Sequence, residues 1–284
     1  MANIFFILTS LAFIYPFWML ISISITAESA IKEFGYMLIP KRVDFSAYTL
    51  LLKNPTKIID AYVITMAQAL LGTAVSVILM ALCAYPLSQK DCRFRGKLSF
   101  FIFIPMIFTG GIIPSYILIT QYLKLTDTIW AYILPSLLAP FHIMLFRSFF
   151  AGLPDALTES AKIDGADEFV VFFRIITPLS KPVFASVFLF GLLARWGDWY
   201  TSLVYINDPK LHSLQFLLQR TLQEVEMIKT FAIQGLSVDM SVRDLPSESM
   251  RFALCLIAAG PMLIVFPIFQ KYFTTGITVG AIKG

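Results

Sequence analysis

Residues 61–89 read AYVITMAQALLGTAVSVILMALCAYPLSQ, a run of 29 residues without one charged side chain. A helix needs about 20 largely apolar residues to cross a hydrocarbon core of roughly 30 Å. The run is continuously apolar and does not alternate, which argues against a strand of a membrane β-barrel. It therefore predicts a membrane-spanning helix.

Four further runs lack charge and are long enough to span: residues 1–27, 98–123, 128–146 and 252–270. A sixth segment, 182–204, is interrupted by Arg195 and Asp198. One such run could be the helix of a buried core, but five in one chain argue against that reading. We expect six transmembrane helices, at about residues 4–26, 61–88, 98–121, 129–150, 182–204 and 252–269.

The composition of the whole chain agrees with this class. Hydrophobic residues make up 58% of the 284 residues and charged residues 14%, with a mean hydropathy of +0.77. Soluble domains carry about 25% charged residues, and disordered chains are richer still in charge. A net charge of +4 without a Lys/Arg block also argues against nucleic-acid binding. We therefore expect an all-α integral membrane protein with a single domain.

The short loops predict the orientation. Residues 90–97 contain four basic residues in eight, whereas the next loop contains only Lys124. Positive charge favours the cytoplasm, so both termini are expected there and residues 28–60 and 205–251 outside. The first apolar run lacks the basic flank of a signal peptide and is longer than a usual signal core, so we expect it to span.

Nothing in the sequence indicates catalysis. The three cysteines show no metal-ligand spacing, and no Gly-rich phosphate loop is present. We expect no catalytic residues, no metal site and no cofactor bound by this chain.

The predicted cytoplasmic segment 154–181 reads PDALTESAKIDGADEFVVFFRIITPLSK. Pro154 and Asp155 suit a helix start, and Gly165 suits a left-handed turn before a second helix. Four apolar residues at helical spacing would form one face of that second helix: Phe169, Phe172, Phe173 and Ile176. An amphipathic helix lying on the membrane is the alternative, but its polar face would be basic. The mixed-to-acidic segment better fits a protein-docking element.

This segment resembles the cytoplasmic loop of binding-protein-dependent ABC importers. That loop reads Glu-Ala-Ala, three residues, Gly, nine residues, Ile, one residue, Leu-Pro, and the carbohydrate branch adds Asp-Gly-Ala before a Phe. Ser160 and Thr177 depart from the pattern where Ala and Leu are usual. The matching residues, which the resemblance makes the ATPase-coupling residues, are Glu159, Ala161, Asp164, Gly165, Ala166, Phe172, Ile175 and Pro178.

The resemblance implies a type I permease fold in which this loop is the coupling helix. It would sit in a groove of a separate ATPase subunit, where ATP and Mg²⁺ bind. The implied partners are two ATPase subunits, a homologous second permease forming a heterodimer, an extracytoplasmic solute-binding protein, a saccharide and membrane lipid. The implied location is the bacterial cytoplasmic (inner) membrane. Residues 270–284 also resemble the tail of the smaller permease subunit of sugar importers.

The substrate path is expected where polar groups interrupt the spans. Arg195 and Asp198 are three residues apart and could pair, and charges inside a span usually face the bundle interior. Residues 109–116 contain two Gly and a Pro, which predict a kink or unwinding beside a cavity. A structural ion pair, interfacial aromatics and a packed histidine are the alternative readings. The candidate path residues are Tyr116, His142, Arg195, Trp196, Asp198, Trp199 and Tyr200.

The long outer segment resembles permeases for large saccharides, a branch that includes subunits for acidic polysaccharides such as alginate. Basic residues in and beside the outer segment suit an anionic glycan: Arg195, Arg220, Lys229 and Arg243. The sequence therefore favours an importer of an oligo- or polysaccharide. An ABC permease for a non-sugar solute is the first alternative. An ion-coupled secondary transporter and a membrane-embedded enzyme are the others.

Overall fold

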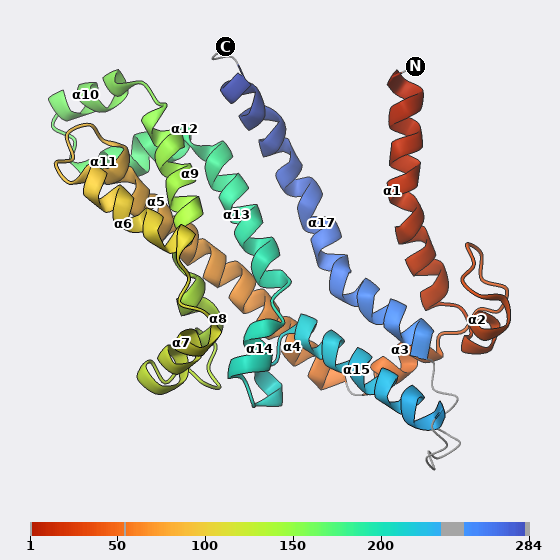
Figure 1. The fold of residues 1–284 in the computed structure, drawn as a ribbon. Coiled ribbons are helices and arrows are strands. Elements are labelled where there is room, and N and C mark those ends of the chain that lie inside the picture. The colour runs from red at the N-terminus through yellow and green to blue at the C-terminus, as the bar shows by residue number, and fades with distance from the viewer. Residues whose placement is uncertain (1, 54, 234–246, 282–284) are drawn as a thin grey trace. The chain divides into compact units, whose positions relative to one another are not determined.

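The structure is a computed structural model that describes residues 2–53, 55–233 and 247–281 (Figure 1). These residues form helices, helical turns and loops, with one isolated β-bridge between Thr26 and Val43. The expected all-α fold is confirmed for this part of the chain.

Three of the described helices are long and apolar enough to cross a membrane: Asn3–Ser24, Pro55–Ser88 and Glu248–Gln270. Three bent pairs of helices also pass when each pair is taken together: Arg95–Ile107 with Ile112–Tyr122, Trp130–Ser136 with Pro140–Ala151, and Glu168–Leu179 with Lys181–Trp196. Counting each pair as one span gives six, the number predicted from the five charge-free runs and the interrupted segment 182–204.

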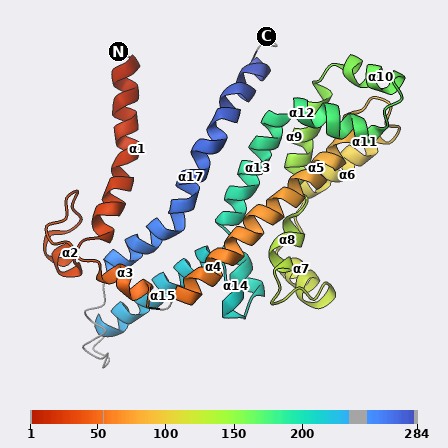
Figure 2. The same ribbon diagram turned by 180° about the vertical axis from the view of Figure 1, so that it is seen from behind.

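The chain divides into two compact units, and residues 63–211 with 264–284 form the larger one. Within it, α5 (Thr73–Ser88), α6 (Arg95–Ile107), α9 (Pro140–Ala151) and α13 (Lys181–Trp196) pack against one another (Figures 1 and 2). Their shared core is aromatic and aliphatic, and it includes Val77, Phe146, Phe150 and Val187. A π-helical turn, Gln68–Gly72, joins α4 (Pro55–Ala67) to α5 without a break in the helix.

Two of the three bent spans of this unit break where the sequence weakens the helix. After α6, Gly111 has φ +85°, and α7 (Ile112–Ile117) then leaves at 110° to α6. The kink that the two glycines predicted is therefore confirmed. The second break separates α8 (Trp130–Ile133) and the 3-10 turn Leu134–Ser136 from α9, whose first residue is Pro140. Proline suits the first position of a helix, so it starts α9 rather than kinking it.

Segment 154–181 folds as α10 (Asp155–Ile163), a turn, α11 (Glu168–Val171), a π-helical turn (Phe172–Ile176) and α12 (Thr177–Leu179). Gly165 has φ +81°, which confirms the predicted left-handed turn. The predicted apolar face is split, because Phe172 and Ile176 are buried whereas Phe169 and Phe173 are exposed. The wider winding of the π turn aligns residues four to five apart, so Phe173 turns away from the core.

After α13 the chain turns at Gly197 and enters α14 (Tyr200–Tyr205), followed by a 3-10 turn, Pro209–Leu211. Asp198 Oδ1 accepts a hydrogen bond from the Thr201 backbone N–H at 3.0 Å, at the start of α14. This turn places a charged side chain and two aromatic ones, Trp199 and Tyr200, beside the end of α13.

The smaller unit comprises residues 1–62 and 212–263. It contains α1 (Ala2–Ser24), α2 (Glu28–Phe34), α3 (Ser46–Leu51), α15 (Leu214–Ile233) and the first part of α17 (Ser247–Ala281). Glu28 Oε2 accepts from the backbone N–H groups of Glu248 and Ser249 at 3.0 and 3.3 Å. A carboxylate is favourable there because the first N–H groups of a helix carry partial positive charge.

Helix α15 lies within the long segment 205–251 that the sequence predicts to be outside. Arg220 pairs there with Glu224, four residues later, at 2.9 Å. The side chain of Lys229, all of Arg243 and the side chains of the tail from residue 271 lie outside the described residues, so the predictions made for them stay predictions.

Candidate functional site

A cavity of about 520 Å³ in the larger unit gathers most of the expected path residues. Volumes of roughly 300–1,000 Å³ are typical of ligand sites. The path residues that line it are His142, Arg195, Asp198, Trp199 and Tyr200. They come from α9, from the end of α13, from the turn after it and from the start of α14, so α9 and the α13–α14 region, which are separated in sequence, contribute to one wall.

Two of the expected residues lie off this wall. Tyr116 does not line the cavity, but its ring stacks on Tyr205, which does, with centroids 6.1 Å apart. Trp196 is only 4% exposed and packs inside the unit. Trp196 is therefore placed as a core residue of α13, next to the cavity wall in sequence but not part of it.

Arg195 is the central polar residue of the wall, although it is 93% buried. Its Nη2 donates to Ser76 Oγ at 2.6 Å and to the backbone oxygen of Ser136 at 2.9 Å, and its Nη1 donates to Thr73 Oγ1 at 3.4 Å. Its backbone oxygen accepts from Gln68 Nε2 at 3.1 Å. The guanidinium thus links α13 to α5 and to the turn before α9. Bonds of this kind are needed because a buried charge is costly when it is left unbonded.

Small residues make room for this side chain. A Cβ added to Gly72 would lie 2.8 Å from Arg195 Nε, and one added to Gly191 would lie 3.5 Å from Nη1. Real Cβ atoms essentially never approach as closely as the first of these distances. The guanidinium therefore occupies a slot that requires glycine at position 72, the last residue of the π-helical turn before α5. A Cβ on Gly191 would instead be tight against Thr73 Cγ2, at 3.0 Å.

Aromatic rings complete the wall. Trp199 and Tyr200 are about 40% exposed, with ring centroids 6.3 Å apart in an edge-to-face arrangement. The ring of His142 is parallel to that of Phe190, with centroids 6.5 Å apart. Exposed rings can stack on the apolar faces of sugars, while a cation and hydroxyls can bind hydroxyl or carboxylate groups. The cavity thus combines the two kinds of group that a saccharide needs.

The second candidate site is α10 and its surroundings. None of the nine residues of α10, all of them described, is buried, and Glu159 and Asp164 are exposed. The helix is held at both ends by ion pairs, Asp155 with Lys90 and Lys162 with Glu168. The hydrogen bond to Glu168, 2.7 Å long, raises the pKa of the Lys162 amine, so this lysine remains charged at neutral pH.

The other residues matched to the coupling motif lie at different depths. Ala161 and Ala166 are half-buried against the core that contains Phe172. Ile175 is half-buried and Pro178 is exposed. The motif therefore builds a helix with an outward face, which includes Glu159, and an inward face packed on the core.

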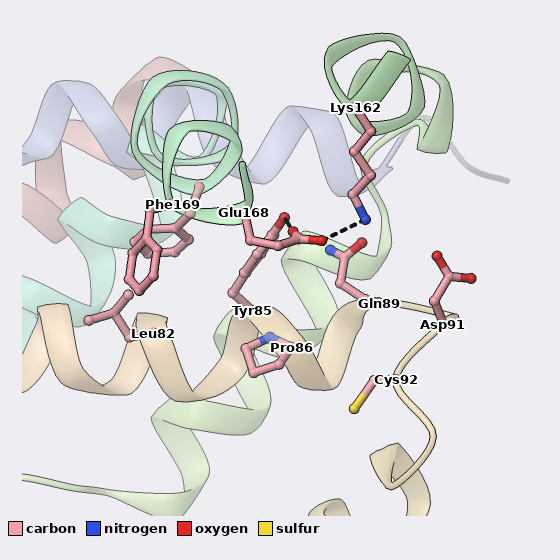
Figure 3. Close-up of a pocket in the computed structure, with 10 residues that line it drawn as sticks. Leu82, Tyr85, Pro86, Gln89, Asp91, Cys92, Lys162, Glu168 and Phe169 are labelled. Atoms are coloured by element: carbon pink, nitrogen blue, oxygen red, sulfur yellow. Dashed lines mark hydrogen bonds and ion pairs between the residues drawn. The ribbon is translucent and has the colours of Figure 1, made fainter. Parts of the chain in front are cut away.

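Sequence reasoning missed four residues that the structure places at these sites. Thr73, Ser76 and Ser136 hold the Arg195 guanidinium, and Tyr85 donates to Glu168 Oε2 at 2.7 Å (Figure 3). A signal was present for two of them, because Thr73 and Ser76 lie three residues apart in the run 61–89. Hydroxyls inside a span at that spacing share a helix face and usually find a polar partner.

Comparisons with known proteins agree with this architecture. The model of the family "Binding-protein-dependent transport system inner membrane component" matches residues 78–279. The chain is 36% identical over 272 residues to Protein LplC of Bacillus subtilis (strain 168), covering 95% of this chain and 90% of that protein. It is 32% identical to the polygalacturonan/rhamnogalacturonan transport system permease protein YtcP of the same organism, covering 99% and 96%.

A solved structure is similar across nearly the whole chain. It is the crystal structure of a bacterial ABC transporter involved in the import of the acidic polysaccharide alginate, with a TM-score of 0.82 and 26% identity. The similarity covers 96% of this chain and 95% of that one. Together with the family match over more than half of the sequence, this removes the secondary-transporter alternative. The chain belongs to the family of inner membrane components of binding-protein-dependent transport systems, and its fold is that of an ABC importer permease.

Proposed function

We propose that this chain is the transmembrane subunit of an ATP-driven, binding-protein-dependent importer of an oligo- or polysaccharide, with acidic glycans as the preferred class. The observation that carries the proposal is the cavity wall on which a buried arginine lies beside exposed aromatic rings. Relatives support the substrate class, since one is named for polygalacturonan and rhamnogalacturonan and another for alginate.

The proposed assembly contains a homologous second permease, two ATPase subunits that bind ATP and Mg²⁺, and an extracytoplasmic binding protein. Helix α10 is the proposed contact with an ATPase, because none of its residues is buried, it carries the motif residue Glu159 on its exposed face, and the turn that follows it contains Gly165. In this arrangement α10 and both termini lie in the cytoplasm and residues 28–60 and 205–251 lie outside. The basic loop at residues 90–97 supports that orientation.

A saccharide panel tests the function. The complex, purified with its binding protein and reconstituted in lipid, is expected to hydrolyse ATP several-fold faster with acidic oligosaccharides than without a sugar. Neutral oligosaccharides of the same length are expected to stimulate less, because they cannot use the Arg195 charge. Stimulation by amino acids or phosphate, with none by any saccharide, would contradict the proposal.

Trp199→Ala is expected to raise the saccharide concentration that gives half-maximal ATPase stimulation by about 3- to 10-fold. An aromatic stacking contact contributes about 0.5–1.5 kcal/mol, a factor of about 2 to 12, and the expected increase lies inside that interval. Trp130→Ala is the matched control, since Trp130 is also exposed but does not line the cavity. Equal responses from the two variants would show that the Trp199 ring does not contact the substrate.

A further inference from the structure

The carboxylate of Glu168 lies at a junction of three elements. Its Oε2 accepts from the hydroxyl of Tyr85 on α5, and its Oε1 pairs with the amine of Lys162 on α10, each at 2.7 Å (Figure 3). Glu168 itself is the first residue of α11. One side chain thus connects the exposed helix to a buried one through both of its oxygens.

Among the residues that the structure describes, α10 has two charged attachments, and this junction is one of them. The other is the ion pair of Asp155 with Lys90 at the opposite end of the helix, and both of its side chains are more than half exposed. Exposed pairs hold weakly because water and salt screen them. The Lys162–Glu168 pair is also partly exposed, with side chains 36% and 56% exposed. Tyr85 is only 7% exposed, so its bond to Glu168 is shielded on the α5 side. The Tyr85–Glu168 bond is therefore the attachment that reaches the core.

Helix α5 contacts both the junction at Glu168 and the cavity wall at Arg195. Tyr85 meets the α10 junction, while Ser76, nine residues earlier, donates to and accepts from the groups around Arg195 in the cavity wall. At 1.5 Å per residue, the two contacts are about 14 Å apart along one helix. Between them, Val77, Met80, Ala81 and Ala84 are buried in the core. Close-packed helices transmit displacement because they have no space in which to deform.

We propose that Tyr85 is a positioning residue, whose hydrogen bond to Glu168 holds α10 in register with α5 so that motion of α10 reaches the Arg195 wall. This inference rests on the proposed function, because it needs an ATPase that moves α10. It names a residue outside the motif at residues 159–178. It also names the residues through which motion of α10 would reach the cavity wall, in the order Lys162, Glu168, Tyr85 and Ser76.

The cavity beside the junction favours such a role. It has a volume of about 560 Å³, and its lining combines apolar residues such as Leu82 and Phe169 with the polar groups of the junction (Figure 3). Space on one side lets the α11 end shift, while the hydrogen bond limits that shift. Removing only the Tyr85 hydroxyl leaves the ring packed on Phe172, with centroids 5.3 Å apart.

The test uses Tyr85→Phe, Glu168→Gln and the double variant, each in the reconstituted complex with its binding protein. Tyr122→Phe is the matched control, since that tyrosine is 77% exposed. The measurements are basal ATPase, saccharide-stimulated ATPase, saccharide uptake into vesicles and the thermal midpoint of the complex. Tyr85→Phe is expected to lower uptake about 10-fold while basal ATPase stays within 2-fold, so that more ATP is hydrolysed per saccharide imported.

The double variant is expected to be no worse than the worse single variant, because both changes act on one junction: Tyr85→Phe removes the donor to Glu168, and Glu168→Gln removes the charge that pairs with Lys162. An unchanged ratio of ATP hydrolysed to saccharide imported in Tyr85→Phe would overturn the inference. So would a fall in uptake that only follows a fall in the thermal midpoint, which is the result of a purely structural role. If Glu168→Gln does not assemble, Lys162→Met tests the same junction from α10. A wild-type complex that no saccharide stimulates would instead contradict the proposed function.

Discussion

Gly165→Val is expected to abolish saccharide import while the protein still inserts in the membrane. Gly165 adopts φ +81°, a left-handed conformation that costs non-glycine residues about 1–2 kcal/mol and β-branched residues more. A valine would move the turn toward ordinary backbone angles. That change would redirect α10 relative to α11 and take its outward face, with Glu159, away from the ATPase groove. Uptake by cells, compared at equal membrane levels of protein, measures the effect.

Two further variants isolate the backbone as the cause. A Cβ on Gly165 meets no atom within 4 Å, so the strain of a side chain there comes from the left-handed backbone. Gly165→Asn should retain much of the uptake, because asparagine tolerates the left-handed region. Gly96→Val is the matched control, since a Cβ there is also unobstructed and the backbone is not left-handed. Equal uptake in Gly165→Val and Gly96→Val would show that the turn does not matter for coupling.

The helices of this protein could be predicted well because their signal is local. Whether a segment spans the membrane depends on its own length and apolar composition. Residues 61–89 therefore predict a span without reference to any other segment. The same holds for Gly165, because the left-handed turn follows from the glycine and its place after α10. The break at Gly111 could also be predicted from local sequence, since a pair of glycines weakens a helix wherever it lies in the chain.

The cavity could be predicted only in part, because its contacts join distant residues. Arg195 was a candidate from its cost inside a span, but its partners Ser76 and Ser136 lie 119 and 59 residues away in sequence. The Tyr85–Glu168 bond spans 83 residues. Trp196 shows that the sequence can also suggest a residue wrongly. Its aromatic ring suited a sugar-binding wall, but it lies on a face of α13 that is buried inside the unit.

Arg195→Met is expected to remove most of the preference for acidic over neutral saccharides, lowering the ratio of their ATPase stimulation by about 10-fold or more. A hydrogen bond to a charged group contributes about 1.5–3 kcal/mol, and 1.4 kcal/mol corresponds to a factor of ten. The fold should survive, because the hydrogen-bond partners of the guanidinium, Thr73, Ser76 and the Ser136 backbone oxygen, are neutral, so its removal leaves no opposite charge buried without its partner among them. Ser76 also keeps a partner, since its hydroxyl lies 3.4 Å from the Ser136 backbone oxygen.

Displacing the Arg195 guanidinium should reduce the preference for acidic saccharides as much as removing it does. In Gly72→Ala the new Cβ would lie 2.8 Å from Arg195 Nε, so the guanidinium must leave its slot although its charge is intact. Gly260→Ala is the control, because a Cβ there meets nothing within 4 Å. If both Arg195→Met and Gly72→Ala reduced stimulation by acidic and neutral saccharides equally, Arg195 would be a link between helices only. A selective loss with acidic saccharides in both variants would require that the position of the charge, and not its presence alone, recognises the glycan.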